Sequence, residues 1–262
     1  MKSSAKKIYK NLLFNVRKSL NSIKKHTKFD WYYNDFNELK RQRGNDNTFE
    51  LGPMRPILSD KNDDGGVMSG HYFHQDLYVA RLIHIAKPEK HLDIGSRMDG
   101  FVAHVASFRE IEIIDIRPYK NHVKNIRYRQ ADLMILPPEL IDYCDSVSSL
   151  HAIEHFGLGR YGDPIDYSGY LKAINNITKI LKSGGVFYFS VPIGPQRIEF
   201  NAHRVFSLKY LSELLSQNYT IHSFSFVDDK GDFFENVMLT NENISTNCGC
   251  YYGCGIFTCI KK

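Results

Sequence analysis

The sequence contains no apolar run long enough to cross a bilayer, which takes about 20 residues. The Leu12-Leu13-Phe14 cluster is too short, and too interrupted by charge, to form the apolar core of a signal peptide. The five cysteines are an odd number and four of them follow residue 247, which is not typical of a secreted disulfide framework. Internal repeats are also absent. We therefore expect a soluble, cytoplasmic protein, with peripheral contact at the inner face of the membrane as an additional option.

Acidic side chains are missing from residues 1–25, which carry eight lysines and arginines. The whole chain has a net charge of +5, so subtracting these eight leaves the rest at −3, and a broad nucleic-acid-binding surface is not expected. The same segment has a stripe of apolar residues on one helical face. These are Ile8, Leu12, Val16, Leu20 and Ile23. Such a basic amphipathic helix would rest on an anionic membrane, bind a partner or pack on its own domain.

The chain is predicted to form one main domain behind an N-terminal extension. Its 262 residues, of which 42% are hydrophobic, suffice for one complete core. Residues 40–70 are rich in Asn, Asp, Gly and Pro, and DKNDDGG at 60–66 has turn chemistry throughout. We expect a helix-and-loop extension over residues 1–70 and a domain over 71–262.

From Gln75 onward, segments typical of strands alternate with segments typical of helices. Helices are expected over 75–86, 101–108 and 169–185, the last ending at Gly184-Gly185. Strands are expected over 91–95, 110–115, after Tyr128, within 142–155, over 186–194 and over 253–262. This order predicts a doubly wound α/β domain with a mostly parallel sheet and helices on both faces.

In this fold class ligands bind where parallel strands end, so residues at those ends are candidates for contact with a ligand. Asp93-Ile94-Gly95 opens the first such turn, and Asp115 closes the second strand 20 residues after Gly95. A carboxylate there can accept bonds from two ribose hydroxyls. Asp132, after the third strand, either meets an adenine amino group or caps a helix.

The order of motifs resembles the class I S-adenosylmethionine-dependent methyltransferases, which have a Rossmann-like, seven-stranded sheet. More closely, GHYFHQDLYVA, DIGSRMDGFVAH, SSLHAIEHFGLGRYGDP, SVPIG, FNAHRVFS and GCGIF resemble the DUF268 family. This resemblance implies S-adenosylmethionine as cofactor. The residues that it implies for cofactor binding are Asp93, Gly95, Ser96, Arg97, Asp115, Ile116, Asp132, Leu133, Leu150 and His151.

The first loop departs from the methyltransferase pattern D-x-G-x-G-x-G. Arg97 stands at the second glycine position, and the third falls on Asp99 unless the loop is one residue longer and Gly100 takes its place. A side chain at such a position keeps the backbone away from a ligand. Arg97 would bind the cofactor carboxylate or an acceptor phosphate, or else pair with a surface acid.

Candidates for the methyl-transfer step follow the fourth strand. His151, Glu154 and His155 would form one group, with His155 or His151 as general base, or would only cap and pack the loop. His203 is a further catalytic candidate on a loop after the fifth strand. Arg160, Arg197 and Arg204 would together grip a phosphorylated acceptor, or act individually as structural residues.

A metal is not expected. His71, His74 and Asp76 form one group of suitable residues and His151, Glu154 and His155 another, but neither matches a specific zinc or iron signature. The cysteines of CGCYYGCGIFTC have no usual zinc spacing, and residues 253–262 are typical of a core strand.

These observations predict a methyltransferase that acts on a hydroxyl of a sugar, a nucleotide-sugar or a phosphorylated small molecule in surface-polysaccharide or capsule biosynthesis. A phosphate or phosphoramidate oxygen is the alternative acceptor. The competing hypothesis is a non-catalytic, methyltransferase-like protein that docks on a membrane-associated assembly. Nucleic acid is not among the expected partners.

Overall fold

The computed structural model describes residues 30–262 and divides the chain into two compact units, residues 1–67 and 68–262. The amphipathic helix expected over 8–23 lies outside the described residues. In the first unit, residues 30–43 are helical and a short 3₁₀ turn, η1, spans Asp60–Asn62. Lys61 joins the two, because its Nζ lies 3.2 Å from Asp35 and 4.1 Å from the ring centroid of Trp31.

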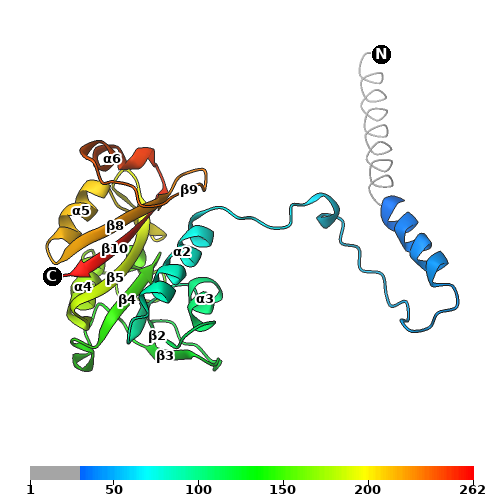
Figure 1. Cartoon of the computed structure of the whole chain (residues 1–262), viewed down its shortest axis with the longest axis horizontal. Helices are drawn as coiled ribbons and strands as arrows, with labels where there is room; N and C mark the ends of the chain where they lie inside the picture. The colour runs from blue at the N-terminus through cyan, green and yellow to red at the C-terminus, as the bar shows by residue number, and fades with distance from the viewer. Residues whose placement is uncertain (1–29) are drawn as a thin grey trace, which may run out of the picture. The chain divides into compact units, whose positions relative to one another are not determined.

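The second unit is built on a mixed sheet of order β3-β2-β1-β4-β5-β10-β8-β9 (Figure 1). The first five of these strands are parallel to their neighbours, whereas β10, β8 and β9 join antiparallel. The strands are β1 (His91–Ile94), β2 (Ile111–Asp115), β3 (Ile126–Gln130), β4 (Cys144–Leu150), β5 (Leu181–Ile193), β8 (Tyr219–Val227), β9 (Phe233–Phe234) and β10 (Gly253–Lys261). A separate hairpin pairs β6 (Arg197–Glu199) with β7 (His203–Val205).

Helices cover both faces of the sheet, and each face has its own apolar core (Figure 1). On one face, α4 (Gly169–Ile180) and α5 (Leu208–Ser216) bury residues such as Ile177 and Leu211. On the other, α2 (His71–Ala86) and α3 (Ala103–Ala106) bury residues such as Ile83 and Val105. Adjacent positions along a strand serve opposite cores, as Ile113 and Ile114 of β2 do, because side chains alternate across a sheet.

The remaining elements are short. They are η2, a π-helix (Met98–Val102), the 3₁₀ turns η3 (Pro138–Leu140), η4 (Ile153–His155) and η5 (Asn247–Gly249), and α6 (Asn241–Thr246). Among the residues described, no helix is long and apolar enough to cross a membrane.

The expected Rossmann-like α/β architecture is present, with four local differences. The sheet has eight strands rather than seven, because Phe233–Phe234 pairs with the edge strand β8. The third strand begins at Ile126, before Tyr128. The helix expected over 101–108 starts instead as a π-helix at Met98. The third expected helix stops at Ile180, because Leu181 is already extended and pairs with Cys144 of β4.

Candidate functional site

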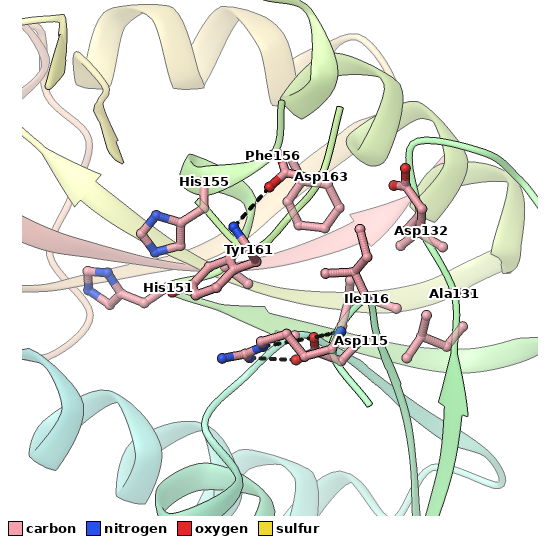
Figure 2. A pocket seen from close by; sticks show the side chains of 15 residues that line it. Asp115, Ile116, Ala131, Asp132, His151, His155, Phe156, Tyr161 and Asp163 are labelled. Atoms are coloured by element: carbon pink, nitrogen blue, oxygen red, sulfur yellow. Dashed lines mark hydrogen bonds and ion pairs between the residues drawn. The ribbon is translucent and has the colours of Figure 1, made fainter. Parts of the chain in front are cut away.

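A pocket with about 530 Å³ of empty space lies at the carboxyl ends of β1, β2 and β4. Strand β1 has β2 on one side and β4 on the other, so the strand order reverses here, and ligands of doubly wound sheets bind at such a point. Figure 2 shows His151 and His155 on one side of the pocket and Ala131 and Asp132 on the other. The pocket therefore stands where the sequence predicts a ligand.

The side chain of Asp93 stabilises the turn after β1 through hydrogen bonds. Its buried carboxylate accepts hydrogen bonds from the Ser96 backbone N–H (3.0 Å), the Ser96 hydroxyl (2.6 Å) and the Ser148 hydroxyl (2.5 Å). Ser96 Oγ in turn accepts from the Leu150 N–H at 3.0 Å. Burial raises the pKa of Asp93 to about 7, although the three donors oppose this rise.

This network corrects part of the expected cofactor set. Asp93, Ser96 and Leu150 are buried and do not line the pocket, so they shape the turn rather than its inner wall. Gly95 does line the pocket and has φ +69°, a conformation that glycine adopts without strain. A Cβ there would also lie only 3.1 Å from the Cβ of Ala152.

Asp115 closes β2 inside the pocket, and Arg117 occupies both of its carboxylate oxygens. The Arg117 guanidinium donates to Asp115 at 3.0 and 2.6 Å, and the Arg117 backbone N–H donates at 2.8 Å. The same guanidinium lies 4.5 Å from the ring centroid of Tyr161. The carboxylate expected to meet ribose hydroxyls is thus covered by an arginine and a tyrosine of the protein itself.

Asp132, after the third strand, stands in a turn and not at the start of a helix, and its contact with an adenine amino group stays a prediction. Its Oδ1 accepts from the Met134 N–H at 2.9 Å, which stabilises a turn, and the residue also lines the pocket. Ile116 and Leu133 line the pocket beside it, with Ala131. These apolar side chains form a slot of a kind suited to a flat heterocycle.

The unusual residues of the first loop serve structure instead of ligand contact. Arg97 pairs with Asp99 at 2.9 Å on the surface and stacks over Tyr72, and it does not line the pocket. The surface-acid alternative is therefore the one realised for Arg97. Gly100 has no positive φ, but a Cβ there would lie 2.2 Å from Oδ2 of Asp76. Glycine leaves room for a buried carboxylate of α2 at this position.

His155 is the pocket residue best prepared to accept a proton. Its Nδ1 lies 2.6 Å from the Ala202 carbonyl oxygen, so Nδ1 carries the proton and Nε2 keeps its lone pair. Burial lowers the pKa of His155, which keeps the imidazole neutral.

His151 is held differently, in a left-handed backbone conformation with φ +50°. Its Nδ1 lies 2.8 Å from Oε1 of the buried Glu154. Burial alone would lower the pKa of His151, but the charges of Cys254 and Glu154 raise it to about 10. Near neutral pH this imidazole therefore keeps its second proton and is not a free base, so His155 is the better candidate.

The other predicted catalytic and substrate residues do not line the pocket. His203, on β7, lies 3.1 Å from Glu199 and packs on Tyr252. Arg204 is buried and donates to the carbonyl oxygens of Glu154, Phe156 and Tyr167.

The three arginines expected to grip a phosphorylated acceptor do not gather on this pocket; Arg197 and Arg204 line a separate one, and the grip stays a prediction. Arg204 is engaged by backbone carbonyls. Arg197 pairs with Glu199 at 2.7 Å and donates to the carbonyl oxygens of Pro195 and Tyr251. Arg160 is the member nearest the pocket, where it donates to the Ala202 carbonyl oxygen beside His155.

Several residues of this region could not be selected from the sequence. Arg117 and Tyr161 meet over the pocket from separate loops, and Asp163 lines it. His71, from the start of α2, stacks on His151 with ring centroids 5.2 Å apart. Tyr161, Asp163 and His71 lie in the strings that carry the family resemblance, and His71 also stands in one of the groups considered for a metal, whereas Arg117 had no signal.

Comparisons with known proteins agree with the fold. A family model described as "Caenorhabditis protein of unknown function, DUF268" matches residues 110–247. No curated protein matches the sequence. The 1,6-didemethyltoxoflavin-N1-methyltransferase of Burkholderia thailandensis, solved with 1,6-didemethyltoxoflavin and S-adenosylhomocysteine, is 16% identical over 72% of this chain and 78% of its own, with a TM-score of 0.52.

The N-methyltransferase NodS of Bradyrhizobium japonicum WM9, solved with S-adenosylhomocysteine, is 13% identical over 86% of this chain and 97% of its own. Its TM-score is 0.47. At the identity of the Burkholderia enzyme the likeness shows a shared fold, so the Rossmann-like methyltransferase fold expected from the sequence is confirmed.

Proposed function

The chain belongs to the DUF268 family, and from this membership, the fold and the pocket we propose that it is an S-adenosylmethionine-dependent methyltransferase. The observation that carries the proposal is the convergence of Gly95, Asp115 and Asp132 on one pocket at the reversal of the strand order, with His155 on its opposite wall. Two solved proteins that share features of this fold were crystallised with S-adenosylhomocysteine.

The residues of the pocket fit this cofactor chemically. Asp115 is a carboxylate at the end of β2, where it can accept bonds from ribose hydroxyls once Arg117 moves aside. Ile116 and Leu133 supply apolar contact for an adenine ring, and the side chain of Asp132 reaches the same space.

Bound S-adenosylmethionine supplies an electrophilic methyl group on a sulfonium. The acceptor oxygen forms a bond to this methyl carbon as the carbon–sulfur bond breaks, so the protein has to align the acceptor and exclude water. His155 Nε2 takes the proton of the acceptor hydroxyl, and the Ala202 carbonyl keeps the ring in the required tautomer. Without such a base the reaction of an alcohol would lose about 10²–10⁴-fold in rate.

The acceptor is a small molecule with a hydroxyl group, and we infer a sugar or nucleotide-activated sugar used in surface-polysaccharide biosynthesis. Around the two pocket histidines lie partly exposed aromatic rings, which offer apolar faces together with hydroxyl groups. Tyr161 is 5.5 Å from the ring of His155, and Tyr72 is 5.2 Å from that of His151. The two arginines nearest these histidines are already engaged, Arg117 by Asp115 and Arg160 by the Ala202 carbonyl oxygen, so a neutral sugar hydroxyl is favoured over a phosphate oxygen.

Calorimetry on the full chain tests the proposal. Both S-adenosylmethionine and S-adenosylhomocysteine should bind with one site per chain, and Asp115→Ala should weaken both by at least about tenfold, the loss of one good charged hydrogen bond. If neither ligand binds folded protein, the enzyme proposal fails. Binding without turnover on any sugar acceptor would instead support a non-catalytic binding protein.

A further inference from the structure

Three ligand-type side chains from distant parts of the sequence meet next to the cofactor pocket. His71 opens α2, His151 follows β4 and Cys254 lies in β10, and one donor atom of each lies within 4.8 Å of the other two. His71 is partly buried and the other two are buried. Three metal-binding side chains in one small space form a site that the sequence pattern does not display.

The three donor atoms converge on one space, with the imidazole rings of His71 and His151 stacked nearly parallel at 14°. His151 Nε2 is buried and has no hydrogen-bond partner among the described residues. Burying such a nitrogen without a partner is unfavourable, and a bound cation would remove this cost. The sulfur of Cys254 donates weakly to Oε1 of Gln75 at 3.6 Å, but this oxygen also accepts from Ser190 at 2.6 Å.

Glu154 orients the ring of His151. Its carboxylate holds His151 Nδ1 at 2.8 Å, which directs Nε2 toward the cluster. Histidines that bind metals almost always donate their second ring nitrogen to a carboxylate or carbonyl in this way.

The types of donor select the ion. Two imidazoles and one thiolate suit zinc, whereas magnesium and calcium prefer oxygen. In a tetrahedral zinc site the donor atoms lie roughly 3.3–3.6 Å apart, given Zn–N and Zn–S lengths of about 2.0–2.3 Å. To reach that geometry the donor atoms have to approach one another and the two imidazole rings have to rotate out of their stacked arrangement.

We propose that His71, His151 and Cys254 bind a zinc ion with an open fourth position. Three protein ligands and one open position are typical of catalytic rather than structural zinc. Because His151 also lines the cofactor pocket, this position would be available to the acceptor hydroxyl, whose proton zinc would make easier to remove. The effect on the acceptor rests on the proposed methyl transfer, whereas zinc binding does not.

The test uses the full chain, stripped with a chelator and titrated with Zn²⁺ or Co²⁺ under reducing conditions. We expect one equivalent of Co²⁺ to bind and to give the near-ultraviolet charge-transfer band of a cobalt–thiolate bond. Cys254→Ser should abolish this band, and His71→Ala should weaken the affinity for Zn²⁺ by at least about 100-fold. Glu154→Gln should weaken it by about 10–100-fold. The matched controls are Cys259→Ser, in the same strand, and His74→Ala, in the same helix, and both should leave affinity unchanged.

Three results would overturn the site: no stoichiometric binding by folded native protein, a charge-transfer band that survives in Cys254→Ser, or an equal loss in the two control variants. The spectrum of the native protein answers the question even if a variant does not fold. Calorimetry with S-adenosylmethionine on the same samples keeps the two proposals apart. Cofactor binding without cobalt binding rejects only the zinc site, and cobalt binding without cofactor binding rejects only the methyltransferase.

Discussion

The ion pair between Asp115 and Arg117 leads to the sharpest prediction, because its two partners should affect cofactor binding in opposite directions. Asp115 is nearly inaccessible to solvent, and every bond to its carboxylate comes from Arg117. A ribose that binds Asp115 must displace the guanidinium. Arg117→Ala removes this competitor, whereas Asp115→Ala removes the acceptor itself.

The magnitude follows from the exposure of the pair. Hydrogen bonds to charged groups contribute about 1.5–3 kcal/mol, but the Arg117 side chain is 41% exposed, and screening by water reduces the contribution of the pair to about 1–2 kcal/mol. Arg117→Ala should therefore strengthen S-adenosylmethionine binding by about 5–30-fold. Arg117→Ala should also lower the unfolding free energy of the unliganded protein, again by about 1–2 kcal/mol. Asp115→Ala should weaken binding by about 10–100-fold.

Calorimetry measures the affinities, and thermal unfolding without ligand measures the stability. Arg127→Ala is the matched control, because Arg127 forms an exposed salt bridge with Glu110 outside the pocket. It should change neither quantity appreciably. Weaker binding in Arg117→Ala would refute the reasoning, since the arginine would then contact the cofactor itself. If both pocket variants bound the cofactor with unchanged affinity, the cofactor would not contact Asp115.

Three further predictions concern other parts of the domain. Gly100→Ala should destabilise the fold by about 1–3 kcal/mol, because the new Cβ would clash with Asp76 Oδ2. Urea unfolding measures this loss of stability, which should be smaller when Asp76→Ala is also present. His155→Ala should lower turnover by about 10²–10⁴-fold with cofactor affinity retained, and full activity would remove His155 as base. Burial raises the folded-state pKa of Asp93 from 3.8 to about 7, so its protonated carboxyl stabilises the fold below pH 4 and this contribution is lost as the pH rises to 7. Asp93→Asn should make the unfolding free energy depend less on pH over this range. An equal pH dependence in the native protein and the variant would contradict the assignment.

Much of the fold is predictable because it depends on local patterns. The short apolar run around Leu92 and the paired isoleucines of β2 indicate buried parallel strands, and α4 shows the spacing of an amphipathic helix. Parallel strands joined by helices place their carboxyl ends along one edge, so Gly95, Asp115 and Asp132 could be expected together before any coordinates. Chain order and side-chain period are enough for this step.

Side-chain roles within the site depend on residues far away in the chain. The sequence places Asp93 at the turn, but tertiary packing directs it inward to Ser148, and Arg204 is likewise held by carbonyls of a distant loop. No local period records such contacts. Only the folded domain could show which charged groups were already paired.

The sequence by itself determined the order of strands and helices, the fold class and the edge at which a ligand binds, since these follow from hydrophobic period and connection length. The tertiary structure alone decided that Arg117 covers Asp115, that the Ala202 carbonyl holds Nδ1 of His155, and that His71, His151 and Cys254 meet. These three residues are separated by 80 and 103 positions in the chain, and they become neighbours because α2, β4 and β10 pack around one end of the sheet.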